Sequence, residues 1–400
     1  MGSRRVVITG MGIISAHGCG VDENREGFRR GIDSIGEISS FDASGYRGKR
    51  GGEVKDFVFK KGFKRLRADR LDRSTLLLCA AFEEALSASG LNGISERCLV
   101  SLGTTLGGML SGMAYHREGL KRGFDHARPG LIVDYLAHNQ AANLLTEYGL
   151  KGESLTFSDA CASSSNAIGY AFHRVRSGDV DVAVAGGYDT MCEFTFAGFN
   201  SLQAITPTIC RPFDRKRDGL VLGEGAAIFI LEPLDSALAR GAEPLGEIIG
   251  YGASSDAYHS TRPDPEGKGA VAAIGTALND AAVSPDAVDY INAHGTATPY
   301  NDLMEAKAIE EVFGGRDVPV SSIKPMIGHL LGASGAAEAA ATVMALREGF
   351  IPPNINCTDP DPEWGVSVSV EADRKATLGR ALSNSFGFGG VNAALLFQGC

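Results

Sequence analysis

One cysteine lies where the chain could make a thiol nucleophilic. Cys161 follows a short apolar run (155–157) and precedes three serines, after which residues 168–177 keep a helical spacing up to Gly178. The pattern predicts a strand that turns sharply into the first turn of a helix. Free N–H groups and the positive end of the helix dipole stabilise a thiolate there. A buried cysteine can also simply pack as a small apolar side chain, so this residue alone leaves both roles open.

Two histidines farther along the chain extend the set of reactive groups. His294 ends an apolar run (288–291) at a turn of Gly and Thr, and His329 lies in a glycine-containing loop before an alanine-rich stretch. Either could be an ordinary core histidine. Glycines around both, however, let the backbone come close to a ligand. One nucleophilic cysteine with two histidines suits carbon–carbon bond formation on thioesters.

With these motifs the chain resembles the β-ketoacyl-acyl-carrier-protein synthases, condensing enzymes of the thiolase-like superfamily. The resemblance runs from residues 6–12 (Val-Val-Ile-Thr-Gly-Met-Gly) to residues 384–392 (Asn-Ser-Phe-Gly-Phe-Gly-Gly-Val-Asn). Its Cys-His-His set is that of the elongating branch, whereas initiating members carry Cys-His-Asn and thiolases Cys-His-Cys. The resemblance implies an acyltransferase that performs a decarboxylating Claisen condensation. An acyl group on Cys161 would react with malonyl-acyl-carrier protein to give 3-oxoacyl-acyl-carrier protein, in fatty-acid elongation or a related type II polyketide or polyene pathway.

The resemblance also gives roles to surrounding residues. The backbone N–H groups of Cys161 and Phe388 would form an oxyanion hole, and the Phe388 ring would gate the acyl pocket. Lys324 and Glu338 would form a polar network behind the histidines, and the alanines around Glu338 independently favour a buried, partnered carboxylate. The remaining substrate contacts would be the phosphopantetheine-binding hydroxyls of Thr261, Thr296 and Thr298 and the acyl-pocket side chains of Leu106 and Phe199. Asp302 and Glu305, which follow the His294 loop, are interpreted as structural.

Composition excludes several other classes of protein. The 400 residues are 44% hydrophobic and 22% charged, as in ordinary globular proteins, and no run of eighteen apolar residues predicts a membrane span. The eight cysteines show neither C-x-x-C spacing nor a compact disulfide pattern, which favours reduced thiols in a cytoplasmic protein without a metal site. Neither a Walker A motif nor a complete dinucleotide fingerprint occurs. We therefore expect no cofactor other than the phosphopantetheine that the substrates carry.

Apolar strands alternate with helical segments, which predicts α/β layers. The two halves echo each other: residues 223–231 and 389–397 both pass from glycines through small residues into an apolar run. Each half also holds a small-residue helix headed by a catalytic candidate, from Cys161 to about 177 and from His329 to about 348. The resemblance implies a thiolase-like five-layer αβαβα sandwich built from two pseudo-repeated halves, 1–245 with the cysteine and 246–400 with the histidines.

Charge points to the kind of partner. The net charge of −10 argues against nucleic acid. Residues 60–73 are nevertheless strongly basic, containing Lys60, Lys61, Lys64, Arg65, Arg67, Arg70 and Arg73. Such a run is usually a solvated face, but in an acidic protein it also suits an acidic carrier protein. We expect Lys64, Arg65, Arg67 and Arg70 to form part of that dock. The resemblance further implies a dimer, either a homodimer or a heterodimer.

Two other functions stay open from the sequence. A thiolase acting on coenzyme A thioesters would need a second catalytic cysteine near residues 387–389, where this chain has Phe388. A non-catalytic or regulatory partner subunit of a heterodimeric synthase should have lost the thiol or a histidine, and all three remain. Residues 204–214 are shorter than the matching loop of housekeeping fatty-acid synthases, which favours a specialised polyene or polyketide pathway.

Overall fold

Two similar sheets, joined at one edge, form the frame of the molecule. The computed structural model describes residues 4–59, 62–361 and 364–400. In the first half the strand order is β6 (Glu153–Phe157), β5 (Cys98–Gly103), β7 (Val182–Asp189), β8 (Gly225–Pro233) and β1 (Val6–Ser15). In the second half it is β13 (Ser367–Val368), β11 (Pro319–Ser321), β10 (Tyr290–Asn292), β15 (Arg380–Gly387), β16 (Val391–Gln398) and β9 (Gly246–Ser255). A short antiparallel pairing of β1 with β9 joins the halves.

The strand directions repeat from one half to the other. In the first half β5 runs parallel to β6 and β7, while β7–β8 and β8–β1 are antiparallel. In the second half β10 runs parallel to β11 and β15, while β15–β16 and β16–β9 are antiparallel. The predicted pseudo-repeat is therefore confirmed, with β1, β5, β6, β7 and β8 matched by β9, β10, β11, β15 and β16.

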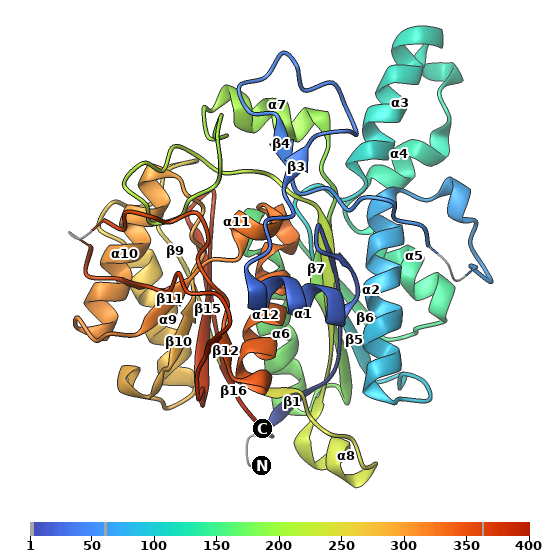
Figure 1. Cartoon of the computed structure of the whole chain (residues 1–400). Coiled ribbons are helices and arrows are strands. Elements are labelled where there is room, and N and C mark those ends of the chain that lie inside the picture. The colour runs from blue at the N-terminus through green and yellow to red at the C-terminus, as the bar shows by residue number, and fades with distance from the viewer. Residues whose placement is uncertain (1–3, 60–61, 362–363) are drawn as a thin grey trace.

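Helices complete five layers. On the outer faces, α2 (Arg73–Ser89) and α5 (Asn139–Tyr148) cover the first half, and α9 (Lys268–Asp280) and α10 (Pro299–Phe313) cover the second. Two central helices, α6 (Ser163–Ser177) and α12 (Ser334–Glu348), touch each other and strands of both halves (Figure 1). The predicted αβαβα sandwich is confirmed.

The composition of α12 explains why it can lie in the middle layer. Every residue from Ser334 to Leu346 is buried, and most are small, with alanine the commonest. A helix enclosed on all sides must be apolar all round, and small side chains let its neighbours approach closely. At Gly335 the approach is so close that a Cβ would lie 2.1 Å from the Ser165 hydroxyl of α6.

The structure corrects where the two central helices begin. The sequence predicted helices headed by Cys161 and His329, but α6 begins at Ser163 and α12 at Ser334. Single 3₁₀ turns, η3 (Ala160–Ala162) and η5 (Leu331–Ala333), precede them. Both turns open on a left-handed residue, Ala160 at φ 55° and Leu331 at φ 54°, which a right-handed helix cannot include.

Shorter helices and strands surround the two sheets. The remaining helices are α1 (Val21–Arg30), α3 (Met109–Arg122), α4 (Pro129–Tyr135), α7 (Glu193–Ser201), α8 (Leu234–Ala239), α11 (Lys324–Ile327) and the 3₁₀ turns η1 (Ala68–Arg70), η2 (Phe124–His126) and η4 (Pro285–Ala287). The remaining short strands are β2 (Gly18–Cys19), β3 (Gly36–Glu37), β4 (Arg50–Gly51), β12 (Phe350–Ile351) and β14 (Arg374–Lys375). In Figure 1, α3 and α4 project from the top of the sandwich.

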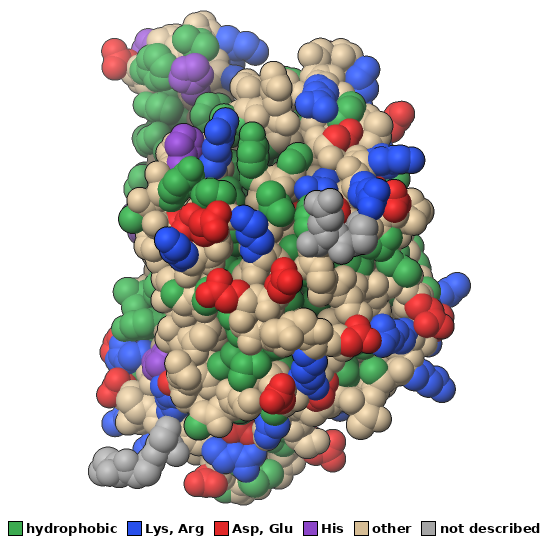
Figure 2. Space-filling model, turned by 90° about the vertical axis from the view of Figure 1, so that its left-hand side faces the viewer, with side chains coloured by type: hydrophobic (Ala, Val, Ile, Leu, Met, Phe, Trp, Pro, Cys, Tyr) green, Lys and Arg blue, Asp and Glu red, His purple; other side chains and the backbone are tan. Residues whose placement is uncertain are grey.

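The surface shows mixed charge. On the face that carries α9 and α10, basic and acidic side chains are interspersed, with no single basic field (Figure 2). Among the described residues, no helix combines the length and apolarity that crossing a membrane requires.

One prediction follows from the packing of β5 against α6. A Cβ on Gly103 would lie 2.2 Å from the Ser164 nitrogen and 2.3 Å from the Ser163 carbonyl carbon, both backbone atoms. Gly103→Ala should therefore lower the free energy of unfolding by about 1–3 kcal/mol, measured by denaturant titration. Gly275→Ala is the matched control, because nothing lies within 4 Å of that position in α9. The control should raise stability by about 0.5–1 kcal/mol, as alanine does in a helix interior. Equal effects at both positions would contradict the packing argument.

Candidate active site

A strained turn presents Cys161 at the amino end of α6. The turn between β6 and α6 is closed by Ser163, whose hydroxyl accepts the Asp159 N–H at 2.9 Å and donates to the Ala160 carbonyl at 2.6 Å. Gly387, at the end of β15, packs so closely that a Cβ there would lie 3.2 Å from the Cys161 nitrogen. The second half of the chain therefore supports the turn that carries the thiol.

His329 faces this thiol directly. Its Nε2 lies 2.9 Å from the Cys161 Sγ, and the Leu331 N–H donates to its Nδ1 at 3.1 Å. The Ser334 hydroxyl lies 2.7 Å from the same nitrogen. Because a backbone N–H can only donate, Nδ1 must accept, and the ring proton of the neutral imidazole is on Nε2. His329 thus directs an N–H toward the space beside the sulfur.

His294 is held in the same way. Its ring centroid lies 5.5 Å from that of His329, and the Lys324 ammonium lies 3.2 Å from its Nδ1. An ammonium group has no lone pair, so Nδ1 accepts and Nε2 again carries the proton. The Glu305 carboxylate fixes the loop by accepting the backbone N–H groups of His294 and Gly295, each at 2.8 Å. Asp302 accepts the N–H of Thr296 at 3.1 Å, so both acids have the structural contacts expected of them.

A buried ion pair lies behind the two histidines. Lys324 and Glu338 are both about 1% exposed, and the Lys324 ammonium also donates to the His294 carbonyl. Burial raises the pKa of Glu338 to about 7, which the Lys324 charge partly opposes. Burial, followed by the Lys324 charge, holds the pKa of both imidazoles well below their usual range. Both histidines are therefore neutral N–H donors.

The thiol itself differs from the thiolate predicted from the sequence. Burial raises the pKa of Cys161 to about 12, against the opposing effects of Lys324 and of the Phe388 N–H that hydrogen-bonds to the sulfur. The helix terminus acts in the same direction as those two groups, but the closed surroundings outweigh it. The resting sulfur is a neutral thiol.

These three side chains lie at the end of a cavity of about 470 Å³. Five other predicted residues line it: Thr261, Thr296, Thr298, Phe199 and Phe388. The rings of Phe199 and Phe388 are stacked, with centroids 5.4 Å apart at an interplanar angle of 18°. The Thr296 and Thr298 hydroxyls are hydrogen-bonded at 2.8 Å. The fold thus brings together residues spread over more than two hundred positions of the chain.

Leu106 lies outside the lining of this cavity. It packs in an apolar cluster with Met191, Phe196 and Leu331, and Phe199 packs against the same cluster. Phe199 and Leu220, which line the cavity and also pack in or against the cluster, therefore lie between the two. A chain that extends beyond them would enter the cluster that contains Leu106.

The cavity wall also contains three polar residues that the sequence analysis did not identify. Arg262, Tyr300 and Asn392 also line it, and the Arg262 guanidinium lies 5.1 Å from the Tyr300 ring centroid. Asn392 donates to the Asp256 carboxylate at 2.7 Å. Two of them had an available signal, since Arg262 directly follows Thr261 and Asn392 ends the Gly-Phe-Gly-Gly-Val-Asn run.

The basic stretch is less uniform than its sequence suggests. Lys64, Arg65, Arg67 and Arg70 are exposed, but Arg67 is paired with Asp69 at 2.8 Å. The stretch is anchored to α5 because the Glu147 carboxylate accepts the N–H groups of Lys64, Arg65 and Leu66. In Figure 1, α5 lies on the opposite side of the molecule from α10, the helix that contains the cavity residue Tyr300. Lys60 and Lys61 lie outside the described residues.

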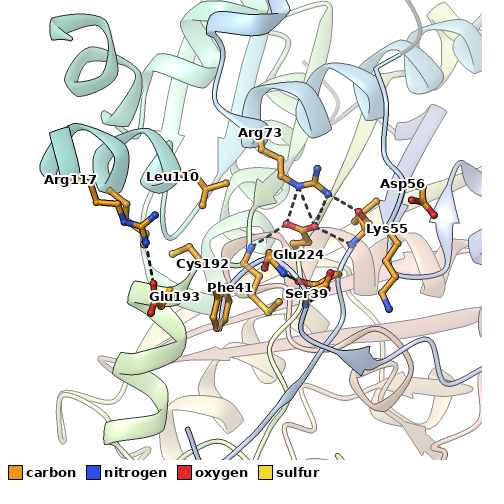
Figure 3. Close-up of a pocket in the computed structure, with 15 residues that line it drawn as sticks. Ser39, Phe41, Lys55, Asp56, Arg73, Leu110, Arg117, Cys192, Glu193 and Glu224 are labelled. Carbon is orange, nitrogen blue, oxygen red and sulfur yellow. Dashed lines mark hydrogen bonds and ion pairs between the residues drawn. The ribbon is translucent and has the colours of Figure 1, made fainter. Parts of the chain in front are cut away.

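Arg73, the last basic residue of the stretch, points inward. Its guanidinium forms an ion pair with Glu224 at 2.8 Å and donates to the Val54 carbonyl at 2.7 Å (Figure 3). The pair lines a second cavity of about 450 Å³, whose other walls include Phe41, Leu110 and Cys192. The Arg73 charge is thus paired within the fold, which distinguishes it from the exposed cations of the stretch.

The Cys161, His294 and His329 ligand atoms lie within 4.8 Å of one another, a spacing that could hold a metal ion. Metal binding through Nε2 would require each ring proton to move to Nδ1. That atom already accepts the Leu331 N–H in His329 and faces the Lys324 ammonium in His294. The donor arrangement therefore favours an anionic substrate atom over a cation at this place.

Comparison with known proteins agrees with this geometry. Residues 3–237 match the description "Beta-ketoacyl synthase, N-terminal domain", and residues 245–358 match "Beta-ketoacyl synthase, C-terminal domain". The chain is 41% identical to 3-oxoacyl-[acyl-carrier-protein] synthase 2 of Synechocystis sp., over 99% of this chain and 98% of that protein.

Solved structures give the same result. The ishigamide ketosynthase/chain length factor superposes with a TM-score of 0.96 at 36% identity, covering 100% of both chains. The ketosynthase of AntDE:AntF, a complex with a type II PKS acyl-carrier protein, superposes with a TM-score of 0.88 at 28% identity and the same coverage.

The buried ion pair generates a prediction. Lys324→Met leaves the Glu338 carboxylate buried without its cation, so the variant should lose about 3–5 kcal/mol of unfolding free energy at pH 8. The loss should be smaller at pH 5. The folded pKa of Glu338, about 7, lies above its unfolded value of 4.5, so this carboxyl is protonated at pH 5 and needs no cation. Denaturant titration at both pH values measures this.

The double variant Lys324→Met/Glu338→Gln is the control. It removes both charges, so it should recover most of the stability. It should not recover activity, because His294 still lacks the donor that fixes its ring. A loss in Lys324→Met that is the same at both pH values would contradict a charge-based cause.

Proposed function

Because the chain belongs to the β-ketoacyl synthase family, we propose that it joins two thioesters by decarboxylating Claisen condensation. An acyl group bound to Cys161 reacts with malonyl-acyl-carrier protein, and the product is 3-oxoacyl-acyl-carrier protein. The observation that carries the proposal is the pair of neutral imidazoles, each fixed as an Nε2–H donor, beside a single buried thiol.

The first step transfers the acyl group to Cys161. The sulfur attacks the thioester carbonyl of acyl-carrier protein, a new C–S bond forms, and the bond to the carrier sulfur breaks. The thiol proton of Cys161 ends on the released carrier thiol, so the step is balanced. The oxyanion of the tetrahedral intermediate is stabilised by the N–H groups of Cys161 and Phe388, which Gly387 brings to the same place.

The second step generates the carbon nucleophile. The C–C bond to the malonyl carboxylate breaks, carbon dioxide leaves, and the electron pair forms an enolate on the thioester. Its oxygen accepts hydrogen bonds from the Nε2–H groups of His294 and His329. Donors that are fixed in advance in a dry site need no rearrangement as the charge develops. Lys324 and Glu338 act through His294 by holding its ring and loop.

The third step forms the new C–C bond. The enolate carbon attacks the acyl-Cys161 carbonyl, the C–S bond breaks, and the sulfur leaves as a thiolate that takes one proton from solvent water to restore the resting thiol. With that proton the sequence balances, and no atom needs an external oxidant or reductant. Phosphopantetheine, which the substrates bring, would lie along Thr261, Thr296 and Thr298.

The two alternative functions fit the site less well. A thiolase would need a second cysteine where Phe388 stacks on Phe199. A non-catalytic subunit would have no need to keep the thiol, both imidazoles and their buried ion pair in contact. The pathway is fatty-acid elongation or a related type II polyketide or polyene pathway, since the relatives include proteins named for both. The short 204–214 loop, which contributes Ala204 to the cavity wall, favours the specialised pathways.

We also propose that the protein works as a dimer in the cytoplasm. The edge strand β6 ends the strand order beside β5, and Leu155 is 39% exposed on it. Exposed apolar side chains continue over α3 and α4, including Leu120, Val133 and Leu136. An open edge beside an apolar surface is normally covered by a partner, here a second copy or a homologous chain. The eight free cysteines suit a reducing compartment.

Replacing the three central residues separates the proposed steps. Cys161→Ala should abolish acyl transfer, because the attacking sulfur is gone. His294→Ala and His329→Ala should still form acyl-Cys161 but release carbon dioxide about 10²–10³-fold more slowly, since each loses one donor to the enolate oxygen. Intact-protein mass spectrometry measures acylation, and carbon dioxide release measures the second step.

Two results would overturn these roles. One is an acyl group located by peptide mapping on Cys210 or any other cysteine. The other is wild-type decarboxylation in both histidine variants. Unchanged circular dichroism spectra would show that each variant is folded.

Charge reversal tests the carrier dock. The Arg65→Glu/Arg67→Glu variant should raise the apparent KM for carrier-linked substrates and weaken its salt dependence, with little effect on small thioester analogues. Arg262→Glu, at the mouth of the cavity, provides the comparison on the opposite side of the chain. A KM increase in Arg262→Glu alone would move the dock to the mouth. Equal losses of activity on carrier-linked substrates and on small thioester analogues would indicate a damaged pocket.

A further inference from the structure

Asp189, a residue that the proposed reaction does not use, is fully buried at the end of β7. One carboxylate oxygen accepts the Thr104 hydroxyl at 2.7 Å and the Leu106 N–H at 2.9 Å. The other accepts the Thr105 N–H at 2.8 Å and the Gly332 N–H at 2.6 Å. The four donors belong to two separate loops, which this single carboxylate joins.

Each of these loops leads to a part of the proposed reaction. Gly332 follows Leu331, the left-handed residue whose N–H fixes the ring of His329. Leu106 packs in the apolar cluster that begins behind Phe199, on the side of the cavity where an acyl chain would extend. The two loops are in direct contact. A Cβ on Gly332 would lie 2.5 Å from the Thr105 nitrogen and 2.8 Å from the Asp189 Oδ2, so a displacement of one loop must be transmitted to the other.

The pseudo-repeat places Asp189 and Gly387 at equivalent ends of strands β7 and β15. The turns η3 and η5 are equivalent, because each opens on a left-handed residue and leads into a central helix of 15 residues. Gly332 therefore occupies the position of Cys161. In the first turn, the matching strand β15 ends in Gly387, which has no side chain to accept the Cys161 N–H. In the second turn, the matching strand β7 ends in Asp189, whose carboxylate accepts a hydrogen bond from the Gly332 N–H. That N–H is therefore not available to an oxyanion.

We propose that Asp189 is a positioning residue that couples the acyl pocket to His329. A displacement of Leu106 by the acyl chain moves the shared carboxylate, and the carboxylate moves Gly332 and the donor that fixes the imidazole. The position of the Nε2–H group that His329 donates to the enolate thus depends on which acyl chain occupies the pocket. This inference rests on the proposed condensation and on the place of Leu106 in its acyl pocket.

Asp189→Asn removes the hydrogen bond from the Leu106 N–H with little change in the shape of the side chain. Three of the four donors are backbone N–H groups, and they lie on both oxygens. An amide has only one oxygen, so its NH₂ group must face at least one of these N–H groups in either orientation. The best orientation keeps the hydrogen bonds from Thr105 and Gly332 and releases the Leu106 N–H. The His329 loop then stays in place, and Leu106 is no longer hydrogen-bonded to the side chain that holds Gly332.

The test is a double-mutant cycle on the decarboxylation step. Leu106→Gly, Asp189→Asn and the double variant are acylated on Cys161, and carbon dioxide release from malonyl-carrier protein is measured. Leu106→Gly should change the rate about fivefold when Asp189 is present and less than about twofold in the Asp189→Asn background. Acylation of Cys161 and the KM for malonyl-carrier protein should stay within about twofold throughout, a separation that general damage to the fold would not produce.

The matched control is Asp72→Asn. Asp72 is equally buried and accepts two backbone N–H groups, from Ser74 and Ser111. Its effect should add to that of Leu106→Gly. Additive effects with Asp189→Asn as well would overturn the coupling. Absence of acyl-Cys161 in the wild-type protein would instead overturn the proposed condensation itself.

If Asp189→Asn does not fold, the wild-type protein still gives a result. With ¹⁵N-labelled histidine, the His329 ring resonances should differ between enzyme carrying a short acyl group and enzyme carrying a long one on Cys161. Identical resonances in the two acyl forms would overturn the proposal.

Discussion

A single ammonium group enclosed in the protein interior sets the chemistry of this site. Lys324 is 1% exposed and donates to the His294 carbonyl and to the Glu338 carboxylate, with the Nδ1 of His294 at 3.2 Å. Burial, followed by the Lys324 charge, holds the pKa of both histidines well below the usual range, and the Lys324 ammonium fixes which nitrogen of His294 carries the proton. A buried charge of this kind is stable only with its partners, so α11, α12 and the His294 loop must come together around it. The position of the N–H donors follows from that requirement.

Backbone strain positions the groups that the ion pair does not reach. Left-handed residues that are not glycine lie beside each catalytic candidate: Ala160 before Cys161, Ala297 after His294 and Leu331 after His329. Such conformations persist only where the surroundings determine them, and they gather at functional sites. Here the surroundings are hydrogen bonds that backbone N–H groups donate to fixed acids and hydroxyls, among them Ser163, Glu305 and Asp189. The duplicated fold supplies two such turns, and only one of them carries a thiol.

The two turns explain why a duplicated architecture suits this reaction. Strand ends from one half support the turn of the other half, since Gly387 of β15 packs on Cys161 and Asp189 of β7 binds Gly332. The nucleophile and the imidazoles therefore meet at the boundary between the halves, above the central pair α6 and α12. A rigid middle layer of small residues keeps that boundary fixed. The cavity and the apolar cluster with Leu106 adjoin at Phe199 and Leu220.

The sequence alone determined the layered α/β class, the strand before Cys161 and the reactive residue types, because these depend on local periodicity and on short motifs. It also indicated a buried, partnered Glu338, since a carboxylate among alanines has no other stable environment. It failed wherever long-range contacts decide the outcome. The helix termini gave way to strained turns, and Arg73 turned inward to Glu224. Only the tertiary structure decided the protonation of the thiol and of each imidazole nitrogen. Those states depend on desolvation and on donors such as Lys324 and the Leu331 N–H, which the folded chain alone brings into contact.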